Sequence, residues 1–223
     1  PQVVHNMKIA EEGLKGHYGV NIGNAIIKND PSLFGKIKGY TAAASEARMC
    51  GCGMAVITNS GSGNQGLAAS IPIILYAQEK HLSEEKMYRA LALSNLLTIY
   101  QKTSIGRLSA FCGAISACCG SGAAMTYLDG GDLELIKKTI INSLADASGI
   151  VCDGAKASCA SKVATGLEAS IIGHFLAMEG KVYEPFSGFL RKDADDTISA
   201  VGRIAREGMK DLDKIILNIM MGD

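Results

Sequence analysis

The fold class follows from the stretch SEEKMYRALALSNLLTIY, which runs from Ser83 to Tyr100. Its apolar and small residues recur every three or four positions, the spacing that places side chains on one face of an α-helix. Ser83 is a good N-cap residue, and two glutamates follow it in the first turn, where the helix dipole favours negative charge. The residues expected on one face are Met87, Leu91, Ser94, Leu97 and Thr98. The stretch therefore predicts an amphipathic helix.

The same spacing extends over most of the chain. It predicts further helices near residues 3–18, 32–49, 66–80, 105–126, 132–147, 156–179, 194–207 and 209–221. The strand-like run Met54–Thr58 is too short to build a sheet. No repeat, low-complexity tail or linker divides the chain. We therefore expect an all-α fold over residues 1–223, one compact domain of about eight to ten packed helices with a Gly/Ser-rich loop.

The composition excludes several classes of partner. The chain has 22 basic and 22 acidic residues, so it lacks the basic surplus that nucleic acid and anionic membranes require. The seven cysteines form an odd number and include an adjacent pair, and we find no signal peptide. Together these features indicate a reducing compartment, the cytoplasm. The chain opens at Pro1 without an initiator Met, from which we expect a fragment of a longer protein.

The segment Leu108–Leu128 carries no charged residue and is long enough to span a bilayer. It is rich in Ser, Gly and Cys, and two charged residues, Arg107 and Asp129, bracket it tightly. Because small side chains let neighbouring helices approach closely, a buried central helix is the favoured interpretation. A small membrane-embedded helical protein is the alternative.

Three cysteines have the spacing of metal ligands. Cys112 stands in Phe-Cys-Gly, and Cys152 and Cys159 bound the segment CDGAKASC. Three thiolates with an open fourth position suit an iron–sulfur cluster, although structural zinc also accepts cysteine ligands. On one straight helix Cys152 and Cys159 would lie roughly 10 Å apart, too far for one compact cluster. We therefore expect Cys152 to lie off the helix that carries Cys159 in its second turn, with Asp153 as N-cap and Gly154 as the break.

The remaining reactive residues have simpler interpretations. Core packing is the favoured interpretation for the other four cysteines and for His174, which lies on an apolar helical face. Those cysteines are Cys50, Cys52, Cys118 and Cys119. Three cations flank the cysteine segments and either bind a carboxylate or are solvated. They are Lys102, Arg107 and Lys156, of which Lys156 is the strongest candidate.

The loop from Thr58 to Gly66 reads TNSGSGNQG. It contains the G-x-G-x-x-G pattern of dinucleotide-binding folds, but the residues after it predict a long helix and no second strand, which excludes that fold. Hydroxyls, amides and free backbone N–H groups at a helix N-terminus suit a small anion such as an amino-acid carboxylate. A flexible Gly/Ser loop without a ligand is the alternative.

Three segments of the chain resemble one known family. TNSGSGNQG, FCGAIS and CDGAKASCASK are similar to segments of the L-cysteine desulfidase family, relatives of the iron–sulfur L-serine dehydratase α chain. The resemblance runs roughly from Tyr40 to the C-terminus, and the last segment is the most specific. It implies a [4Fe-4S] cluster held by Cys112, Cys152 and Cys159, with one iron left open for substrate. It also implies that the loop holds the substrate carboxylate through Thr58, Asn59, Ser60, Gly61, Ser62 and Asn64.

The reaction that this resemblance implies is an α,β-elimination without pyridoxal phosphate. L-cysteine would give hydrogen sulfide and aminoacrylate, which hydrolyses to pyruvate and ammonia, and dehydration of L-serine is the close alternative. The serine enzymes have a longer spacing between the last two cysteines, so the short spacing here favours L-cysteine. Outside the enzymes, the alternative is a non-catalytic helical module with a structural zinc site.

The sequence departs from the family in one respect. Full-length members carry an N-terminal half with a Gly-Cys-Thr-Glu-Pro-type motif whose cysteine takes part in catalysis, and nothing in residues 1–223 matches it. We therefore assign no catalytic base and expect it in the missing half, so the chain alone is expected to be inactive. The expected partners are a small amino-acid substrate, the missing half or a separate chain that carries it, and a second copy in a homodimer.

Overall fold

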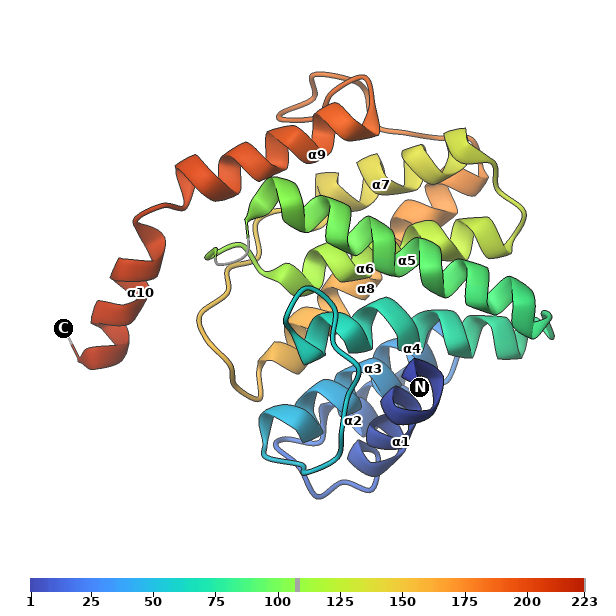
Figure 1. Ribbon diagram of the computed structural model, residues 1–223, viewed down its shortest axis with the longest axis vertical. Coiled ribbons are helices and arrows are strands. Elements are labelled where there is room, and N and C mark those ends of the chain that lie inside the picture. The colour runs from blue at the N-terminus through green and yellow to red at the C-terminus, as the bar shows by residue number, and fades with distance from the viewer. Residues whose placement is uncertain (107–108, 223) are drawn as a thin grey trace.

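The computed structural model describes residues 1–106 and 109–222. Over these ranges the chain forms ten α-helices and one π-helix and no strand (Figure 1). The predicted all-α fold is confirmed. The helices are α1 (Gln2–Gly13), α2 (Ile22–Asn29), α3 (Leu33–Met49), α4 (Gly63–Glu79), α5 (Glu84–Ile105), α6 (Gly113–Leu128), α7 (Leu133–Ala147), α8 (Cys159–Met178), α9 (Ala194–Arg203), the π-helix η1 (Ile204–Gly208) and α10 (Leu212–Met221).

Helix α6 occupies the centre of the molecule and contacts α4, α5, α7 and α8 (Figure 1). Glycines let two of these neighbours approach it closely. A Cβ atom at Gly120 would lie 2.7 Å from the Ser94 carbonyl oxygen of α5, and one at Gly122 would lie 2.8 Å from the Ser170 Cβ atom of α8. The uncharged part of the sequence therefore supplies a buried central helix whose small residues set the distance to its neighbours.

The uncharged segment does not form one long helix. Leu108, where it starts, lies outside the described residues together with Arg107, and α6 begins only at Gly113. Among the helices of the described ranges, none combines the length and the apolar character that crossing a bilayer requires.

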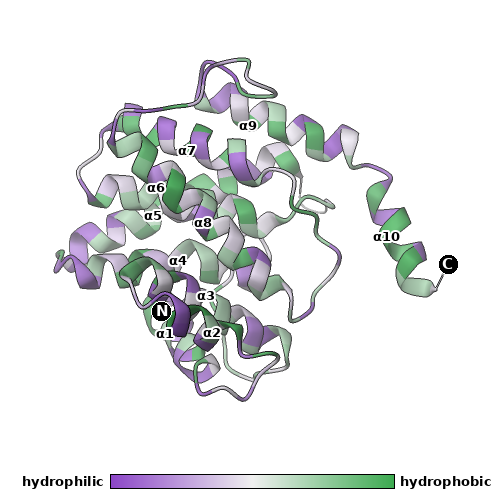
Figure 2. Ribbon diagram, turned by 180° about the vertical axis from the view of Figure 1, so that it is seen from behind, coloured by the Kyte–Doolittle hydropathy of each residue, from purple (hydrophilic) through white to green (hydrophobic). Residues whose placement is uncertain are grey.

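The other helices are arranged around α6. At one end of the molecule α3 packs against α1, α2, α4 and α8 (Figure 1). At the opposite end α9 lies across α5 and α7. Helix α10 follows η1, projects away from this body and has no buried residue (Figure 1). Most of its apolar side chains are exposed, and the ribbon of this helix is coloured largely as hydrophobic in Figure 2.

The stretch that predicted the fold class forms α5. The Ser83 side chain accepts a hydrogen bond from the Lys86 backbone N–H at 3.3 Å, which caps the N-terminus of the helix as expected. The buried residues of the predicted face are Met87, Leu91, Ser94 and Thr98, while Leu97 is half-buried. Local spacing and local capping were sufficient to predict this element.

The sequence pattern does not predict α2, and the predicted helix over residues 3–18 ends early, as α1. The side chain that caps α2 comes from α3, because the buried Glu46 carboxylate accepts hydrogen bonds from the Val20 and Ile22 N–H groups at 2.8 and 2.9 Å. A Cβ atom at Gly19 would lie 2.3 Å from that carboxylate, so the turn before α2 requires glycine. A cap supplied across the fold has no local sequence signature.

The predicted single helix over residues 105–126 is wrong. Helix α5 continues to Ile105 and ends at Gly106, whose φ of +100° favours glycine. The predicted helix over residues 194–207 is present as α9, which continues directly into η1, and the helix predicted over 209–221 is α10. The strand-like run Met54–Thr58 pairs with no strand of the described residues.

His174 is a buried core histidine, as expected. Its Nδ1 atom lies 2.9 Å from the Thr126 hydroxyl, and its Nε2 atom lies 3.5 Å from the Asp129 carboxylate. The same carboxylate accepts a hydrogen bond of 2.7 Å from the Tyr76 hydroxyl. Burial lowers the pKa of His174, so the fold favours the neutral ring.

Candidate functional site

Two extended segments bring Cys112 and Cys152 together. The segment before α6 pairs with the segment after α7, where the Cys112 N–H donates to the Ile150 carbonyl at 3.0 Å and the Cys152 N–H donates to the Ala110 carbonyl at 2.6 Å. The residue pair that forms the antiparallel bridge between the two segments lies between these two hydrogen bonds. Successive side chains of extended backbone point to opposite faces, so both cysteines share the face opposite that pair.

Cys159 is the first residue of α8, and its thiol lies 3.4 Å from the Gly154 carbonyl oxygen. Cys152 therefore lies off α8, as expected, and Gly154 takes a φ of +95° in the turn between the two cysteines. Two details of the prediction are wrong. Cys159 opens the first turn instead of lying in the second, and the N-cap residue of α8 is Ser158 and not Asp153.

Asp153 fixes the loop that precedes α8 instead of capping the helix. It forms ion pairs with Lys156, at 2.5 Å, and with Lys162. Lys162 also donates to the Val151 carbonyl at 2.7 Å. The Lys156 and Lys162 ammonium groups hold the pKa of Asp153 down at about 2. The start of α8 is thereby tied to the loop that carries Cys152.

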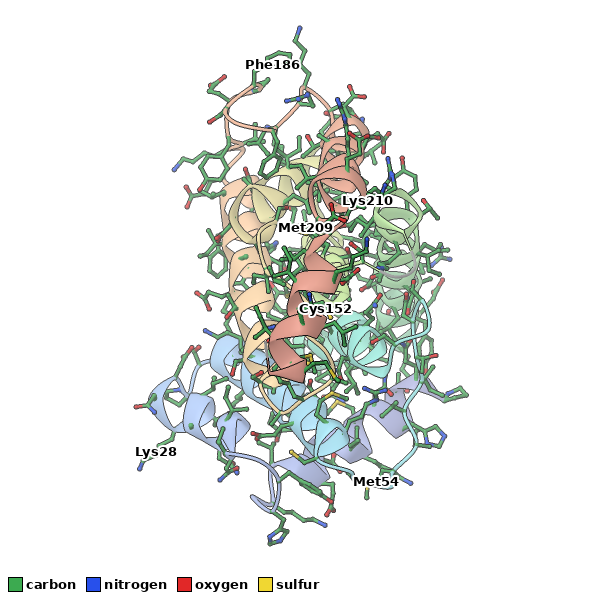
Figure 3. All side chains as sticks on the ribbon, turned by 90° about the vertical axis from the view of Figure 1, so that its left-hand side faces the viewer. Lys28, Met54, Cys152, Phe186, Met209 and Lys210 are labelled. Atoms are coloured by element: carbon green, nitrogen blue, oxygen red, sulfur yellow. The ribbon has the colours of Figure 1, made fainter. Side chains whose placement is uncertain are left out.

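The three thiols lie within electrostatic reach of one another. Burial raises the pKa of the Cys112 thiol, and the charges of the Cys152 and Cys159 thiolates raise it further, while Lys162 acts in the opposite direction. In the view of Figure 3, helix α10 passes in front of the region that contains Cys152. Each thiol therefore ionises more readily when a cation or a metal centre compensates the negative charge of the other thiolates.

The two kinds of metal centre considered from the sequence differ in how closely their donors must converge. Over residues 1–106 and 109–222, no three His, Cys, Asp or Glu side chains converge closely enough to hold one metal ion. A single zinc ion draws its thiolates to about 2.3 Å and so needs tighter convergence. A cluster of several irons is larger and accepts thiolates that lie further apart.

The candidate cations Lys156 and Lys102 differ in burial and in ion pairing. Lys156, the strongest candidate from sequence, is exposed and engaged with Asp153. Lys102 is only 7% exposed, and no carboxylate of the described residues is among the groups that act on its charge. Burial lowers the pKa of Lys102, and the charges of Cys152 and Cys112 partly oppose this effect. Lys102 is thus a largely buried lysine whose charge interacts with those of Cys112 and Cys152.

The TNSGSGNQG loop forms a tight turn in front of α4. Asn59 and Ser62 exchange both backbone hydrogen bonds, at 3.1 and 2.9 Å. Ser60 and Gly61 between them have φ values of +49° and +80°, the conformation of a two-residue turn with positive φ at both central positions. The loop is therefore an ordered turn in this structure.

The turn leads directly into the N-terminus of α4. The Ser62 side chain caps the helix by accepting a hydrogen bond of 3.4 Å from the Gln65 N–H. The N–H groups of Gly63 and Asn64 then have no acceptor within the helix, since the first N–H groups of any helix lack one. These two N–H groups are the ones available at this helix end for the anion that the sequence analysis predicts.

The candidate side chains of this loop differ in their surroundings. Asn59 is buried and donates to the backbone oxygen and the side-chain oxygen of Asn95 in α5, at 3.1 and 2.9 Å. The Ser60 hydroxyl donates to Asn59 at 2.8 Å. Thr58, Ser60 and Gly61 are exposed. Asn59 therefore anchors the turn to α5, and the exposed residues are the ones available to a ligand.

Sequence reasoning missed Arg48, which adds positive charge beside this helix end. Arg48 lies near the end of α3, and its Nη1 atom donates to the Asn64 side chain at 3.3 Å. A Cβ atom at Gly63 would lie 2.2 Å from the Arg48 Nε atom. The guanidinium therefore packs directly on the first turn of α4, and Gly63 is the sequence signal for this close approach.

Gln65, also missed from sequence, connects the loop with the thiols. It lies in the first turn of α4, and a Cβ atom at Gly113 would lie 2.4 Å from the Gln65 Nε2 atom. Gly113 follows Cys112 directly. The Gln65 side chain is buried, and its Oε1 atom has no hydrogen-bond partner among the described residues. The loop and the start of α6, which follows Cys112, are far apart in sequence and therefore meet at this side chain.

The other four cysteines form two groups. Cys118 and Cys119 are buried in α6, where burial raises the pKa of Cys118 well above its ordinary value and that of Cys119 to about 12. The prediction of core packing is confirmed for these two. Cys50 is exposed at the end of α3, contrary to that prediction, and Cys52 is half-buried.

A cavity of 780 Å³ lies elsewhere, against α9 and η1. Its polar and charged lining residues include Arg191, Asp196, Arg203 and Glu207. Arg203 and Glu207 pair with each other at 2.8 Å. No residue of the predicted thiol site or loop lines this cavity.

Comparisons with known proteins identify one family of related chains. A family model described as the serine dehydratase alpha chain matches residues 2–218. A UPF0597 protein of Treponema denticola is 48% identical over 228 residues, which cover 100% of this chain and 53% of that protein. A UPF0597 protein of Desulfitobacterium hafniense is 49% identical over 223 residues, which cover 99% of this chain and 51% of that protein. The chain thus spans about half the length of the curated relatives that it matches. No solved structure shows a significant match.

Proposed function

The chain belongs to the serine dehydratase alpha-chain family, and we propose that it is the iron–sulfur domain of a lyase that acts on a small L-amino acid. The observation that carries the proposal is the pairing of the segments around Cys112 and Cys152, which places both thiols on one face within electrostatic reach of Cys159. The charge of the largely buried Lys102 interacts with those of Cys112 and Cys152. Thiols gathered in this way, with positive charge at hand, suit an anionic metal–thiolate centre.

In this proposal Cys112, Cys152 and Cys159 hold a [4Fe-4S] cluster. When bound, a cluster with three protein thiolates supplies one iron that polarises the leaving group of the substrate. The chain itself prepares the site for such a cluster. Asp153 and Lys162 fix the loop of Cys152 against α8. The thiols of Cys152 and Cys159 are therefore held by the same part of the structure.

The loop in front of α4 binds the substrate carboxylate in this proposal. The N–H groups of Gly63 and Asn64 point out of the helix, and Arg48 adds its charge beside them. The contributing residues of the loop are Thr58, Asn59, Ser60, Gly61, Ser62 and Asn64, among which Asn59 acts by holding the turn. Gln65 packs between this loop and Gly113 and so sets the distance from carboxylate to thiols.

We propose L-cysteine as the substrate, with hydrogen sulfide, pyruvate and ammonia as products. The short spacing between Cys152 and Cys159 supports this choice. L-serine is the second candidate, and the description of the matching family favours it. The base that removes the α-proton is proposed to lie in the part of the longer relatives that this chain does not cover, so the chain alone is expected to be inactive. A cytoplasmic, reducing location would keep the thiols free.

Anaerobic reconstitution with iron and sulfide tests the proposal. We expect a broad visible absorbance and about four irons per chain in the wild type, and loss of both in Cys152→Ala. Cys50→Ala is the matched control, because Cys50 is exposed at the end of α3 and lies outside the three-thiol set. Sulfide or pyruvate release is then assayed with the remaining part of a relative added. Iron uptake that is absent, or indifferent to Cys152, would reject the proposal.

A further inference from the structure

Gln65 occupies a position in α4 at which glutamine ordinarily helps to cap a helix. Ser62 is the N-cap residue, and the stretch from Ser62 to Gln65 has the S-x-x-Q spacing of a capping box. Half of the box is present, because the Ser62 hydroxyl accepts from the Gln65 N–H at 3.4 Å. The other half is replaced, since the Ser62 N–H donates to the Asn59 carbonyl at 2.9 Å. The carboxamide of Gln65 is therefore not used for capping.

This carboxamide lies against the start of α6 instead. Its Nε2 and Oε1 atoms are 2.4 and 3.4 Å from the position that a Cβ atom would take at Gly113, the residue that follows Cys112. Only 7% of the surface of Gln65 is exposed. The side chain is therefore enclosed between the first turn of α4 and the segment of Cys112.

The Oε1 atom of Gln65 is a buried acceptor without a donor. It has no hydrogen-bond partner among the described residues. A buried acceptor that stays unpaired destabilises the folded state, and an apolar side chain of the same length would fill this space without that cost. Unpaired polar atoms in a protein interior are rare and have a specific reason. Neither capping nor packing supplies the reason here.

The neighbouring side-chain amides are already engaged. The Asn64 oxygen accepts a hydrogen bond from Arg48 at 3.3 Å. The Asn59 oxygen accepts one from the Ser60 hydroxyl at 2.8 Å. Among the amide side chains of the loop and the first turn of α4, Gln65 is therefore the one whose oxygen is left for an incoming donor.

We propose that Gln65 selects the α-ammonium group of an amino-acid substrate through a hydrogen bond to its Oε1 atom. This inference rests on the proposed function, in which the Gly63 and Asn64 N–H groups bind the substrate carboxylate. One carbon carries both groups of an α-amino acid, so the ammonium group needs an acceptor beside the carboxylate site. Gln65 directly follows Asn64, and the broad terminal torsion of glutamine lets Oε1 turn toward a donor. Gln65 determines specificity in this way and takes no part in bond making.

The inference predicts which analogue the site rejects. A site built to accept a hydrogen bond discriminates against a ligand that lacks the donor, because the buried acceptor is then left unpaired. L-serine and β-hydroxypropionate share a carboxylate and a hydroxyl group and differ in the amino group. Because hydrogen bonds to charged donors are the stronger ones, we expect the wild type to bind L-serine about 10- to 100-fold more tightly.

Replacing Gln65 with methionine keeps the length of the side chain and removes its acceptor. In Gln65→Met the preference should disappear through weaker binding of L-serine, while the affinity for β-hydroxypropionate should stay near the wild-type value. Gln65→Glu keeps an acceptor oxygen at the same distance along the side chain, so it should retain the preference for L-serine.

Isothermal titration calorimetry of the metal-free chain with the two compounds measures these affinities independently of any cluster. Gln78→Met is the matched control, because Gln78 is an exposed glutamine near the C-terminal end of the same helix and the change should leave both affinities unaltered. The melting temperature of each variant without ligand shows that the variant is folded.

The outcomes separate this inference from the proposed function. Equal binding of the two compounds by the wild type, or a preference that survives in Gln65→Met, would overturn the inference and leave the proposed cluster standing. A Gln65→Met protein that melts below the wild-type temperature would also overturn it, because Oε1 would then have a structural partner. A wild-type chain that binds neither compound would overturn the inference together with the carboxylate site of the loop, and iron uptake would still test the cluster separately.

Discussion

Replacing Gly66 with alanine tests how the TNSGSGNQG loop is held against the protein. A Cβ atom at this position would lie 1.9 Å from the Ile57 carbonyl oxygen, whereas ordinary contact begins at 3.4 Å. The backbone at Ile57 therefore has to move by about 1.5 Å, the difference between these two distances. Ile57 cannot move this far and keep its present contacts with Asn6.

The magnitude follows from those contacts. The Asn6 Nδ2 group donates to the Ile57 carbonyl at 3.3 Å, and the Asn6 Oδ1 atom accepts from the Ile57 N–H at 2.9 Å. Two hydrogen bonds of about 1 kcal/mol each, and about 1–3 kcal/mol for the Asn6 oxygen left buried without a partner, total about 3–5 kcal/mol. About 1 kcal/mol of this loss is offset, because alanine has a higher helix propensity than glycine. The free energy of unfolding should fall by about 2–4 kcal/mol, which lowers the melting temperature by about 4–16 °C.

Thermal unfolding followed by circular dichroism measures this change. Gly208→Ala is the matched control, since the nearest atom to its Cβ position is 3.9 Å away and the substitution should leave the melting temperature equal or slightly higher. Asn6→Ala combined with Gly66→Ala should cost less than the sum of the two single changes, because both remove the same hydrogen bonds. A Gly66→Ala protein that melts at or above the wild-type temperature would refute the reasoning.

Three further predictions concern single side chains. Burial lowers the pKa of His174, so the unfolded chain takes up the proton first, and the melting temperature should fall as pH drops below about 6.5. Gln65→Met removes the unpartnered Oε1 atom and should raise the melting temperature by about 2–4 °C, although the residue is part of the candidate site. A thiol reagent at neutral pH should label exposed Cys50 in the folded protein and should leave Cys118 and Cys119 unmodified until the protein unfolds.

Each of these predictions has an outcome that contradicts it. A melting temperature that stays level between pH 7.5 and 5.5 would show that His174 does not titrate differently in the folded chain. A lower melting temperature of Gln65→Met would mean that its carboxamide has a structural partner. Labelling of Cys118 at the rate of Cys50 would show that α6 is accessible in the folded state.

The sequence determined the elements whose stabilising groups are local. The spacing of apolar residues and the Ser83 cap predicted α5, because both lie within the helix itself. The distance between Cys152 and Cys159 likewise required a break before α8, since a straight helix cannot bring two residues at that spacing close together. The all-α fold class follows from the amino-acid sequence for the same reason, because helical spacing is a property of each segment by itself.

Only the tertiary structure decided the contacts between distant segments. Helix α2 is capped by Glu46 of α3, and the thiol loops pair with each other instead of continuing their helices. Gln65 meets Gly113, although no short-range pattern links these two positions. A sequence pattern reports the neighbours that a residue has along its own helix. Burial depends on what the other helices bring, and it distinguishes Lys102, which is 7% exposed, from the exposed Lys156.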